Sequence, residues 1–514
     1  MKDNYKIILQ ECVNLINLYY NNVFGEVYTK QREKINYMYG QLQSERDRED
    51  FFTLLAESTF DDREFYMIIM TALYSATSDS MCLENMVKIL DKGELDLYKS
   101  FIAAQQIYYV MFMDKSIKIN YIELRKMYEG LLLRFESEID LKADYIPLSE
   151  RDKNKVILVT KQFLGELHAP SRIVREVSAE LQKNFGIKVL VIIALEETNS
   201  DECKQVWLEP FIFNHYEELN GGFTFEYNGE TVEGYQLTIN KENENNIKSL
   251  LNIIRTVKPL FVLSIGDTIA LADVMGKFTH VVTESLTSDI PISTAQTLIN
   301  FNKQLNDIEV LKYIESKGQT FINNKIMFFT DGAKNSYSRR LFNIPEDAFA
   351  ISIVGNRLDM EITEKFIDVL TKILYCNKRI YYVFIGRFDE FSNMITEPML
   401  KDRCAYLGYQ QDLPGIYGMM DLYLNPPRQG GGFSALIAVE NGVPVVTLED
   451  CDVAVNLGKE FTCKSMSEFS DLILKYILDV SFYNRMKEIG YKVAQNSKNL
   501  KSNIEIILKE ISNE

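Results

Sequence analysis

Residues 421–447 read DLYLNPPRQGGGFSALIAVENGVPVVT, and their pattern is a strand, a glycine-rich loop, a helix, a tight turn and a second strand. Three successive glycines, Gly430, Gly431 and Gly432, let the backbone come close to a ligand because no Cβ intervenes. The helix that follows directs its unpaired N–H groups and its positive dipole end toward the same place. The segment therefore suits a bound diphosphate, and a turn that only joins strand to helix is the alternative.

Short apolar runs of strand length alternate with helical patterns on both sides of this segment. A helix is expected over 171–185. The first series of expected strands comprises 156–160, 188–195, 260–265, 280–283 and 325–329. The second series comprises 350–354, 380–385, 405–408, 421–424 and 444–448. Strands and helices that alternate at this spacing predict parallel sheets with right-handed crossovers.

The N-terminal part of the chain follows a different pattern, with apolar residues at three- and four-residue spacing and few prolines, which predicts helices. Asn228-Gly229 lies between alternating residues and predicts a hairpin. The predicted fold class is α/β, with two Rossmann-like domains that face a cleft and follow an all-α domain. The expected divisions are a helical accessory domain at 1–148, a Rossmann-like domain at 149–335 with the hairpin inserted near 222–240, a second Rossmann-like domain at 336–490, and a C-terminal helix at 491–514.

The composition is that of an ordinary globular protein, with 46% hydrophobic and 25% charged residues. The formal net charge of −17 opposes broad attraction to nucleic acid or to an anionic membrane, so we expect no nucleic-acid partner. Seven cysteines without CxxC pairing and three histidines make a structural metal site unexpected. The N-terminal residues do not read as a signal peptide, and no apolar stretch has the length of a membrane span. We expect a cytoplasmic protein, free or peripheral at the inner face of the membrane.

The segment quoted above resembles the donor site of nucleotide-sugar glycosyltransferases of the B fold, in the group 1 or family four class. The tail of that signature, Gly-x-Pro-Val-Val, is Gly442 to Val446 here. The resemblance covers roughly residues 350–448 and implies a nucleotide diphosphate sugar as donor substrate, with no cofactor and no metal ion. The further matches, in the expected order, are ISIVGNRL at 351–358, VFIG at 383–386, AYLG at 405–408, Asp412-Leu413 and Ile416-Tyr417.

By this resemblance, Arg357 neutralises the donor diphosphate as the sugar–phosphate bond breaks, and Lys365 is a candidate for its lysine partner. A metal-free site must meet the charge of the leaving group with preorganised cations and N–H dipoles. A surface ion pair is the alternative role for Arg357, and Arg428 could cap the glycine loop instead of contacting phosphate. The remaining expected donor contacts are Gly386, Gly430, Gly431, Gly432, Phe433, Ser434 and Glu440.

Two positions depart from the family pattern. Ile437 stands where retaining members carry the glutamate that binds the donor ribose, and Gln429 stands in place of the earlier glutamate of that pair. Glu440 lies one helical turn after Ile437, near the same face. Either the ribose is held differently or this member has lost catalysis.

Polar residues after the strands of the first Rossmann-like domain are candidates for the acceptor side, because those loops lie at the sheet edge that faces the cleft. Gly165 and His168 follow the first strand, and Ser171 is a candidate N-cap for the next helix. His168 could position a substrate, act as a base, or be structural. Asp267 could be a base or an acceptor ligand, although capping of the next helix competes with both roles. Glu284 follows the strand expected over 280–283.

The function predicted from these residues is transfer of a hexosyl unit from a nucleotide diphosphate sugar to a hydroxyl acceptor, either a protein or a glycan. Residues 1–148 are the expected place for acceptor recognition, for a partner protein or for homo-oligomer formation. A catalytically silent subunit that assists a partner glycosyltransferase is the main alternative, motivated by Ile437 and Gln429. A sugar-nucleotide epimerase is a third interpretation, but it needs a carboxylate and histidine set of which only His168 presents itself.

Overall fold

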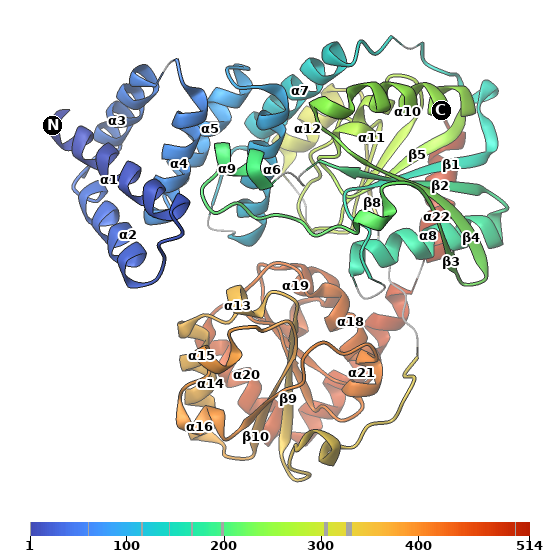
Figure 1. Cartoon of the computed structure of the whole chain (residues 1–514). Helices are drawn as coiled ribbons and strands as arrows, with labels where there is room; N and C mark the ends of the chain where they lie inside the picture. The colour runs from blue at the N-terminus through green and yellow to red at the C-terminus, as the bar shows by residue number, and fades with distance from the viewer. Residues whose placement is uncertain are drawn as a thin grey trace.

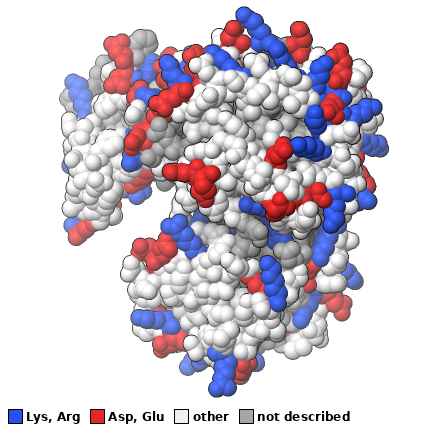
Figure 2. Space-filling model, turned by 45° about the vertical axis from the view of Figure 1, so that its right-hand side comes forward, with Lys and Arg blue, Asp and Glu red and all other residues white. Residues whose placement is uncertain are grey.

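The computed structural model describes residues 2–59, 61–114, 117–142, 144–165, 168–196, 200–302, 307–324, 332–498 and 500–514. A helical region comes first and is followed by two α/β domains, one above the other in Figure 1. Figure 2 shows acidic and basic side chains interspersed over one face of the molecule. Within the described residues, no helix has the length and apolar character needed to cross a membrane.

Most helices of the helical region begin at side-chain caps. Ser44 and Asp47 form a capping box, and Asp62, Asp79 and Asp96 each accept hydrogen bonds from the first turn of the helix that follows. Helices expected from the apolar spacing are thereby confirmed. They are α1 (Lys2–Tyr20), α2 (Glu26–Tyr39), α3 (Glu45–Ser58), α4 (Arg63–Thr77), α5 (Ser80–Asp91), α6 (Leu97–Met113) and α7 (Tyr121–Glu138).

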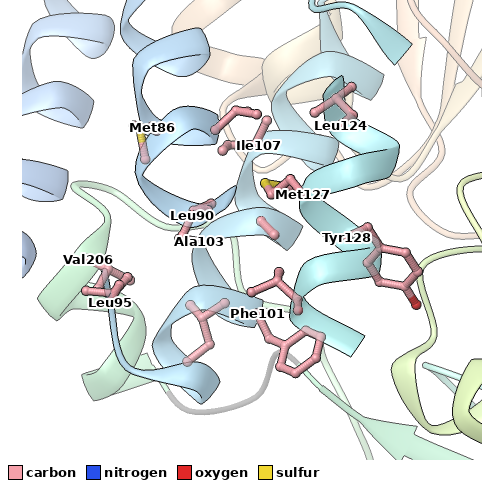
Figure 3. Packing of buried hydrophobic residues seen from close by; sticks show 14 of the residues in the cluster. Met86, Leu90, Leu95, Phe101, Ala103, Ile107, Leu124, Met127, Tyr128 and Val206 are labelled. Atoms are coloured by element: carbon pink, nitrogen blue, oxygen red, sulfur yellow. The ribbon is translucent and has the colours of Figure 1, made fainter. Parts of the chain in front are cut away.

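The core of the helical region continues into the first α/β domain. Figure 3 shows Met86 of α5, Ile107 of α6 and Met127 of α7 directed toward one another. The same hydrophobic cluster includes Ile157 and Val262 from the first sheet. The helices and one face of that sheet therefore share a single core.

The first α/β domain has a sheet of order β3-β4-β2-β1-β5-β6-β7-β8. All its neighbouring pairs are parallel except β3 with β4. β1 ends in five consecutive buried residues, as a central parallel strand covered on both faces should. The strands are β1 (Asp152–Thr160), β2 (Lys188–Leu195), β3 (Gly221–Tyr227), β4 (Glu230–Thr238), β5 (Pro259–Ile265), β6 (Val281–Glu284), β7 (Thr297–Asn300) and β8 (Thr320–Asn323).

Most of the expected strands of this domain are present. Asn228 (φ 50°) and Gly229 (φ 84°) form the predicted hairpin turn between β3 and β4, and β4 joins the sheet beside β2. The short strands β7 and β8 were not predicted, and the strand expected over 325–329 lies outside the described residues. The helices are α8 (Ala169–Phe185), α9 (Ser200–Val206), α10 (Glu244–Val257), α11 (Ala270–Met275) and α12 (Ile308–Ser316), with 3-10 turns η1 (Leu148–Glu150), η2 (Glu217–Leu219) and η3 (Lys241–Asn243).

The second α/β domain has a six-stranded sheet of order β11-β10-β9-β12-β13-β14, and every neighbouring pair is parallel. This is the 3-2-1-4-5-6 order of the doubly wound fold. The strands are β9 (Phe349–Gly355), β10 (Ile380–Gly386), β11 (Cys404–Tyr406), β12 (Leu422–Leu424), β13 (Val445–Leu448) and β14 (Thr462–Cys463). The helices and turns are η4 (Arg339–Phe342), α13 (Leu358–Glu361), α14 (Glu364–Cys376), α15 (Phe391–Met394), α16 (Pro398–Lys401), α17 (Leu413–Tyr417), α18 (Gly432–Glu440), α19 (Asp452–Leu457), η5 (Lys459–Phe461), α20 (Met466–Leu478) and α21 (Val480–Ser497).

The C-terminal residues return to the first α/β domain. The expected single helix at 491–514 is instead the end of α21 and a separate helix, α22 (Leu500–Ser512). Ile504, Ile507 and Ile511 of α22 lie in the hydrophobic cluster that covers the first sheet on the α8 side (Figure 1). Arg151 is paired with Glu514 at 2.6 Å, which fixes the end of α22 to the start of β1.

Candidate functional site

The second sheet changes winding direction between β9 and β12, which are neighbours although seven other elements lie between them in the sequence. The loops after these two strands therefore part at the carboxyl edge of the sheet, which is where doubly wound proteins bind ligands. The loop after β9 contains Arg357, and the loop after β12 contains Gly430 and Gly431. The fold thus brings two sequence-predicted features to one place.

The glycine loop has the backbone that only glycine adopts readily. Gly430 and Gly431 have φ of 85° and 81°, and Gly431 is the N-cap of α18. A Cβ on Gly431 would lie 2.6 Å from Asn425 Oδ1, and one on Gly432 would lie 2.4 Å from a side-chain atom of Asn456. A Cβ on Gly430 would come no closer than 3.5 Å to Arg357 Nη2. Gly431 and Gly432 are therefore packed into the protein, and Gly430 is the member that borders the arginine.

The side chain of Arg357 reaches across to this loop. Its Nη2 donates to the carbonyl of Gln429 at 3.2 Å, and its Nε donates to Glu361 at 3.2 Å. The side chain is 27% exposed, whereas that of Glu361 is buried. A guanidinium held beside a glycine loop and the first turn of a helix is suited to a phosphate group.

Arg428 does not have this freedom, and its predicted role as a phosphate contact is corrected. Only 5% of its side chain is exposed. Its Nε donates to Asn425, its Nη2 donates to the Val354 carbonyl at 2.6 Å and to the Tyr423 hydroxyl, and its Nη1 pairs with Glu361. Burial alone would lower the pKa of Arg428, but Tyr423 and Glu361 raise it above its usual value. Arg428 therefore organises the loop from inside.

The other predicted donor residues are placed differently. Phe433 and Ser434 lie in the first turn of α18, where backbone N–H groups have no partner within the helix. Lys365 is exposed on the first turn of α14. Gly386 has a φ of 116°, and a Cβ there would lie 2.0 Å from the Gly355 carbonyl, so close packing of β9 and β10 requires glycine. Glu440 ends α18 at its far end and is paired with Lys498, so the structure does not bring it to the loop.

The two positions that lack the family's glutamates are buried. Ile437 belongs to the hydrophobic core of the second α/β domain. The Gln429 side chain donates to the Asp450 carbonyl at 2.7 Å, and the backbone carbonyl of Gln429 accepts from Arg357. Neither side chain offers a carboxylate to a ribose.

The first sheet has its own change of winding direction, between β1 and β5. Lys161 follows β1, and its ammonium donates to the Thr268 hydroxyl at 2.7 Å and to Gln105 of α6 at 2.6 Å. Asp267 follows β5 and accepts from the backbone N–H of Ile292. Burial raises the pKa of Asp267, although that bond and Lys161 act in the opposite direction. The predicted capping role of Asp267 is wrong, because Ile269 is the N-cap of α11 and Asp267 accepts from Ile292 instead.

Residues 337–493 match the family model described as glycosyl transferases group 1. The fold of the whole chain is similar to that of an O-GlcNAc transferase variant from Thermobaculum terrenum, with a TM-score of 0.55, 13% identity and coverage of 99% of this chain and 97% of that one. The chain has the GT-B fold of nucleotide-sugar glycosyltransferases. No curated protein sequence matches.

Two other solved structures show weaker likeness to this GT-B chain. A trehalose-phosphate synthase from Burkholderia vietnamiensis has a TM-score of 0.49 and 10% identity, with 71% of this chain and 98% of that one covered. HepE of Anabaena, in complex with UDP, has a TM-score of 0.47 and 12% identity, with 70% and 100% covered. The family match lies in the second α/β domain, the one that contains Arg357 and the glycine loop.

His168, which the sequence predicts on the acceptor side, immediately precedes α8. Its Nδ1 lies 2.7 Å from the Ser171 hydroxyl, and burial together with the Arg175 charge lowers its pKa to about 4. The ring is therefore neutral at pH 7. The sequence predicts Ser171 as the N-cap of α8, but Ser171 lies within the helix and His168 is the N-cap. The Ser171 hydroxyl accepts from the Leu164 N–H instead.

Gly165 and Glu284 complete the predicted acceptor side. A Cβ on Gly165 would lie 3.7 Å from the Tyr216 hydroxyl. Glu284 ends β6 and is buried, and burial raises its pKa to about 8. Its Oε2 has no hydrogen-bond partner among the residues that the structure describes. Burial of Glu284 therefore favours the protonated form of its carboxyl group.

Helix α6 contributes site residues that the sequence analysis missed. The Phe112 ring centroid lies 5.2 Å from the Arg357 guanidinium carbon, and Met113 Sδ accepts from Arg357 Nη1 at 3.3 Å. Tyr109 lies close enough for Arg357 to lower its pKa, against a larger rise caused by burial. In the sequence these residues look like a helical stripe of core side chains, and nothing in the local pattern separates them from it. In the part of the chain that the structure describes, no group of three His, Cys, Asp or Glu residues is placed to hold a metal ion.

Proposed function

We propose that this protein transfers a hexosyl unit from a nucleotide diphosphate sugar to a hydroxyl group of a protein or glycan. The observation that carries the proposal is the position of Arg357 beside Gly430, at the carboxyl edge of the sheet where the winding direction changes. The match of residues 337–493 to the group 1 glycosyltransferases supports the transferase class.

The donor diphosphate would bind between the Arg357 guanidinium and the first turn of α18. Cleavage of the bond between the anomeric carbon and the diphosphate leaves negative charge on the departing nucleotide. The Arg357 guanidinium supplies a positive charge, and the N-terminal end of α18 adds a fixed dipole. Charge stabilisation of this kind acts mainly in the transition state and so accelerates the reaction.

The acceptor would approach from the first α/β domain. His168 is neutral at pH 7 and can exchange hydrogen bonds with a hydroxyl without introducing a positive charge. Residues 1–148 remain our candidate for recognition of the acceptor or of a partner protein.

Release of nucleoside diphosphate tests the proposal. The purified full chain is incubated with UDP-, GDP-, ADP- and dTDP-sugars, and free nucleoside diphosphate is measured with and without candidate acceptors. Slow release from one donor, accelerated by an acceptor, is the expected result. Binding of a donor without release of nucleoside diphosphate, even with acceptors present, would contradict the proposed transferase activity and favour a catalytically silent subunit.

A further inference from the structure

The hydrogen-bond acceptors on the two sides of the Arg357 guanidinium differ in strength. On one side, Glu361 accepts from Nε and pairs with Nη2, and the Gln429 carbonyl accepts from Nη2. On the other side, Nη1 donates to the thioether of Met113. Carboxylate and carbonyl oxygens are strong acceptors, whereas a thioether sulfur is a weak one. The Met113 side is therefore the side that a ligand can take.

A phosphate oxygen would bind Nη1 more strongly than Met113 does. Charge-assisted bonds from arginine to phosphate are among the strong hydrogen bonds of proteins and form with paired geometry. The methionine side chain has three rotatable bonds and can leave without moving its helix. Phe112 cannot move away as easily, because its ring lies over the guanidinium and near Gly430, where a Cβ would be 3.8 Å from its Cζ.

We propose that the last turn of α6 is part of the donor site: Met113 occupies the phosphate position on Arg357 in the empty protein and is displaced by the donor diphosphate, while Phe112 stays and holds the guanidinium in place. The inference rests on the proposed function, because it assumes that Arg357 binds a diphosphate. It extends that function by making Phe112 and Met113 positioning residues contributed by the helical region.

Methyl NMR of methionine reads this displacement directly. The full chain is labelled with 13C at the methionine methyl groups, and the Met113 resonance is assigned by its loss in Met113→Leu. UDP, GDP, ADP and inorganic pyrophosphate are then titrated. The Met113 resonance should shift in step with binding measured by calorimetry. The Met127 resonance, from a fully buried side chain of α7, is the internal control and should not shift.

Two substitutions should change affinity in opposite directions. Met113→Ala removes the competitor for Nη1 and should tighten nucleoside diphosphate binding by about twofold to fivefold, the scale of a sulfur contact. Phe112→Ala removes a cation–π contact that holds Arg357 and should weaken binding by a similar factor. Thermal unfolding of both variants shows whether the fold is retained.

The possible outcomes separate this inference from the proposed function. If a nucleotide binds and the Met113 resonance stays unchanged, or if both substitutions change affinity in the same direction, the inference is overturned and the donor site at Arg357 stands. If none of the four ligands binds the wild-type chain, the proposed function and the inference both fail.

Discussion

The two points where the sheets change winding direction are built in opposite ways. In the second α/β domain, two arginines meet one buried carboxylate, Glu361, and the outer arginine borders the glycine loop. In the first, Lys161 donates to neutral groups of Gln105 and Thr268. The same topology thus yields one edge with a positive group next to the N-terminus of α18, and one edge closed by a helix from another region. Topology locates the edges, and side-chain pairing decides which of them can take an anion.

Arg428→Met should show the largest effect in this comparison. The substitution removes the buried partner of Glu361 and the hydrogen bonds that Arg428 donates to Asn425 and to the Val354 carbonyl, which should cost about 3–5 kcal/mol in the free energy of unfolding. Lys161→Met, at the other sheet, removes the hydrogen bonds to Gln105 and Thr268 and should cost about 1.5–3 kcal/mol. Denaturant unfolding followed by circular dichroism compares the two. Equal losses would show that the two edges are organised alike.

Arg357→Ala should leave the fold intact and reduce turnover. Loss of one preorganised electrostatic contact to the leaving group costs roughly 2.7–4 kcal/mol, on the order of a hundredfold to a thousandfold in kcat. Arg357→Lys should recover part of the loss, because the ammonium retains the charge and not the paired geometry. Arg387→Ala is the matched control, since Arg387 follows the neighbouring strand β10 but is exposed and pairs with Asp389. Wild-type kcat in Arg357→Ala, with the true donor, would show that another group meets the leaving charge.

Gly431→Ala and Gly430→Ala separate the packed part of the loop from the part that faces the arginine. Both place a side chain at positive φ, at a cost of about 1–2 kcal/mol. Gly431→Ala adds a clash with Asn425, and overpacking of this kind costs about 1–3 kcal/mol more. Gly431→Ala should therefore lower the melting temperature further than Gly430→Ala. A larger decrease in melting temperature for Gly430→Ala would mean that the buried side chains around Arg428 can rearrange at little cost to accept the extra methyl group.

The last prediction concerns the pH dependence of stability at the first sheet. Burial raises the pKa of Glu284 to about 8, so the folded protein binds more protons than the unfolded chain between the ordinary glutamate pKa and pH 8. Stability from this group is complete below the ordinary pKa and is lost as the pH rises toward 8, by at most about 1.4 kcal/mol per pH unit. In Glu284→Gln this slope should disappear, as measured by unfolding at pH 6, 7 and 8. An unchanged slope would mean that Glu284 is already ionised in the native state.

Much of the fold can be predicted from the sequence, because buried parallel strands are continuous apolar runs. The central strands β1, β9 and β10 are predicted in this way, and the hairpin follows from Asn228-Gly229. The short strands β7 and β8 were not predicted, because each has only two apolar residues with a polar residue on either side.

The candidate site is only partly predictable, for a physical reason. Arg357 and the glycines belong to local patterns that point to the site. The contribution of α6 depends on contacts of Phe112 and Met113 with Arg357, and Met113 and Arg357 are 244 positions apart in the sequence. The burial of Arg428 depends likewise on Glu361, which sequence spacing does not pair with it. Local patterns therefore identify the loop, and they do not show what covers it or what holds it from within.

Because α22 returns to the first α/β domain, the second domain is connected to the rest of the molecule by two separate crossings of the chain, one before η4 and one between α21 and α22. A body attached at one point can swing and rotate in any direction, whereas a body attached at two points keeps mainly one rotation, about the line that joins them. The ion pair of Arg151 with Glu514 and the apolar face of α22 hold the C-terminal helix against the first α/β domain. Motion of the second domain should therefore be mainly a rotation about the line that joins the two crossings, and it would have to break the contacts of Arg357 with Phe112 and Met113.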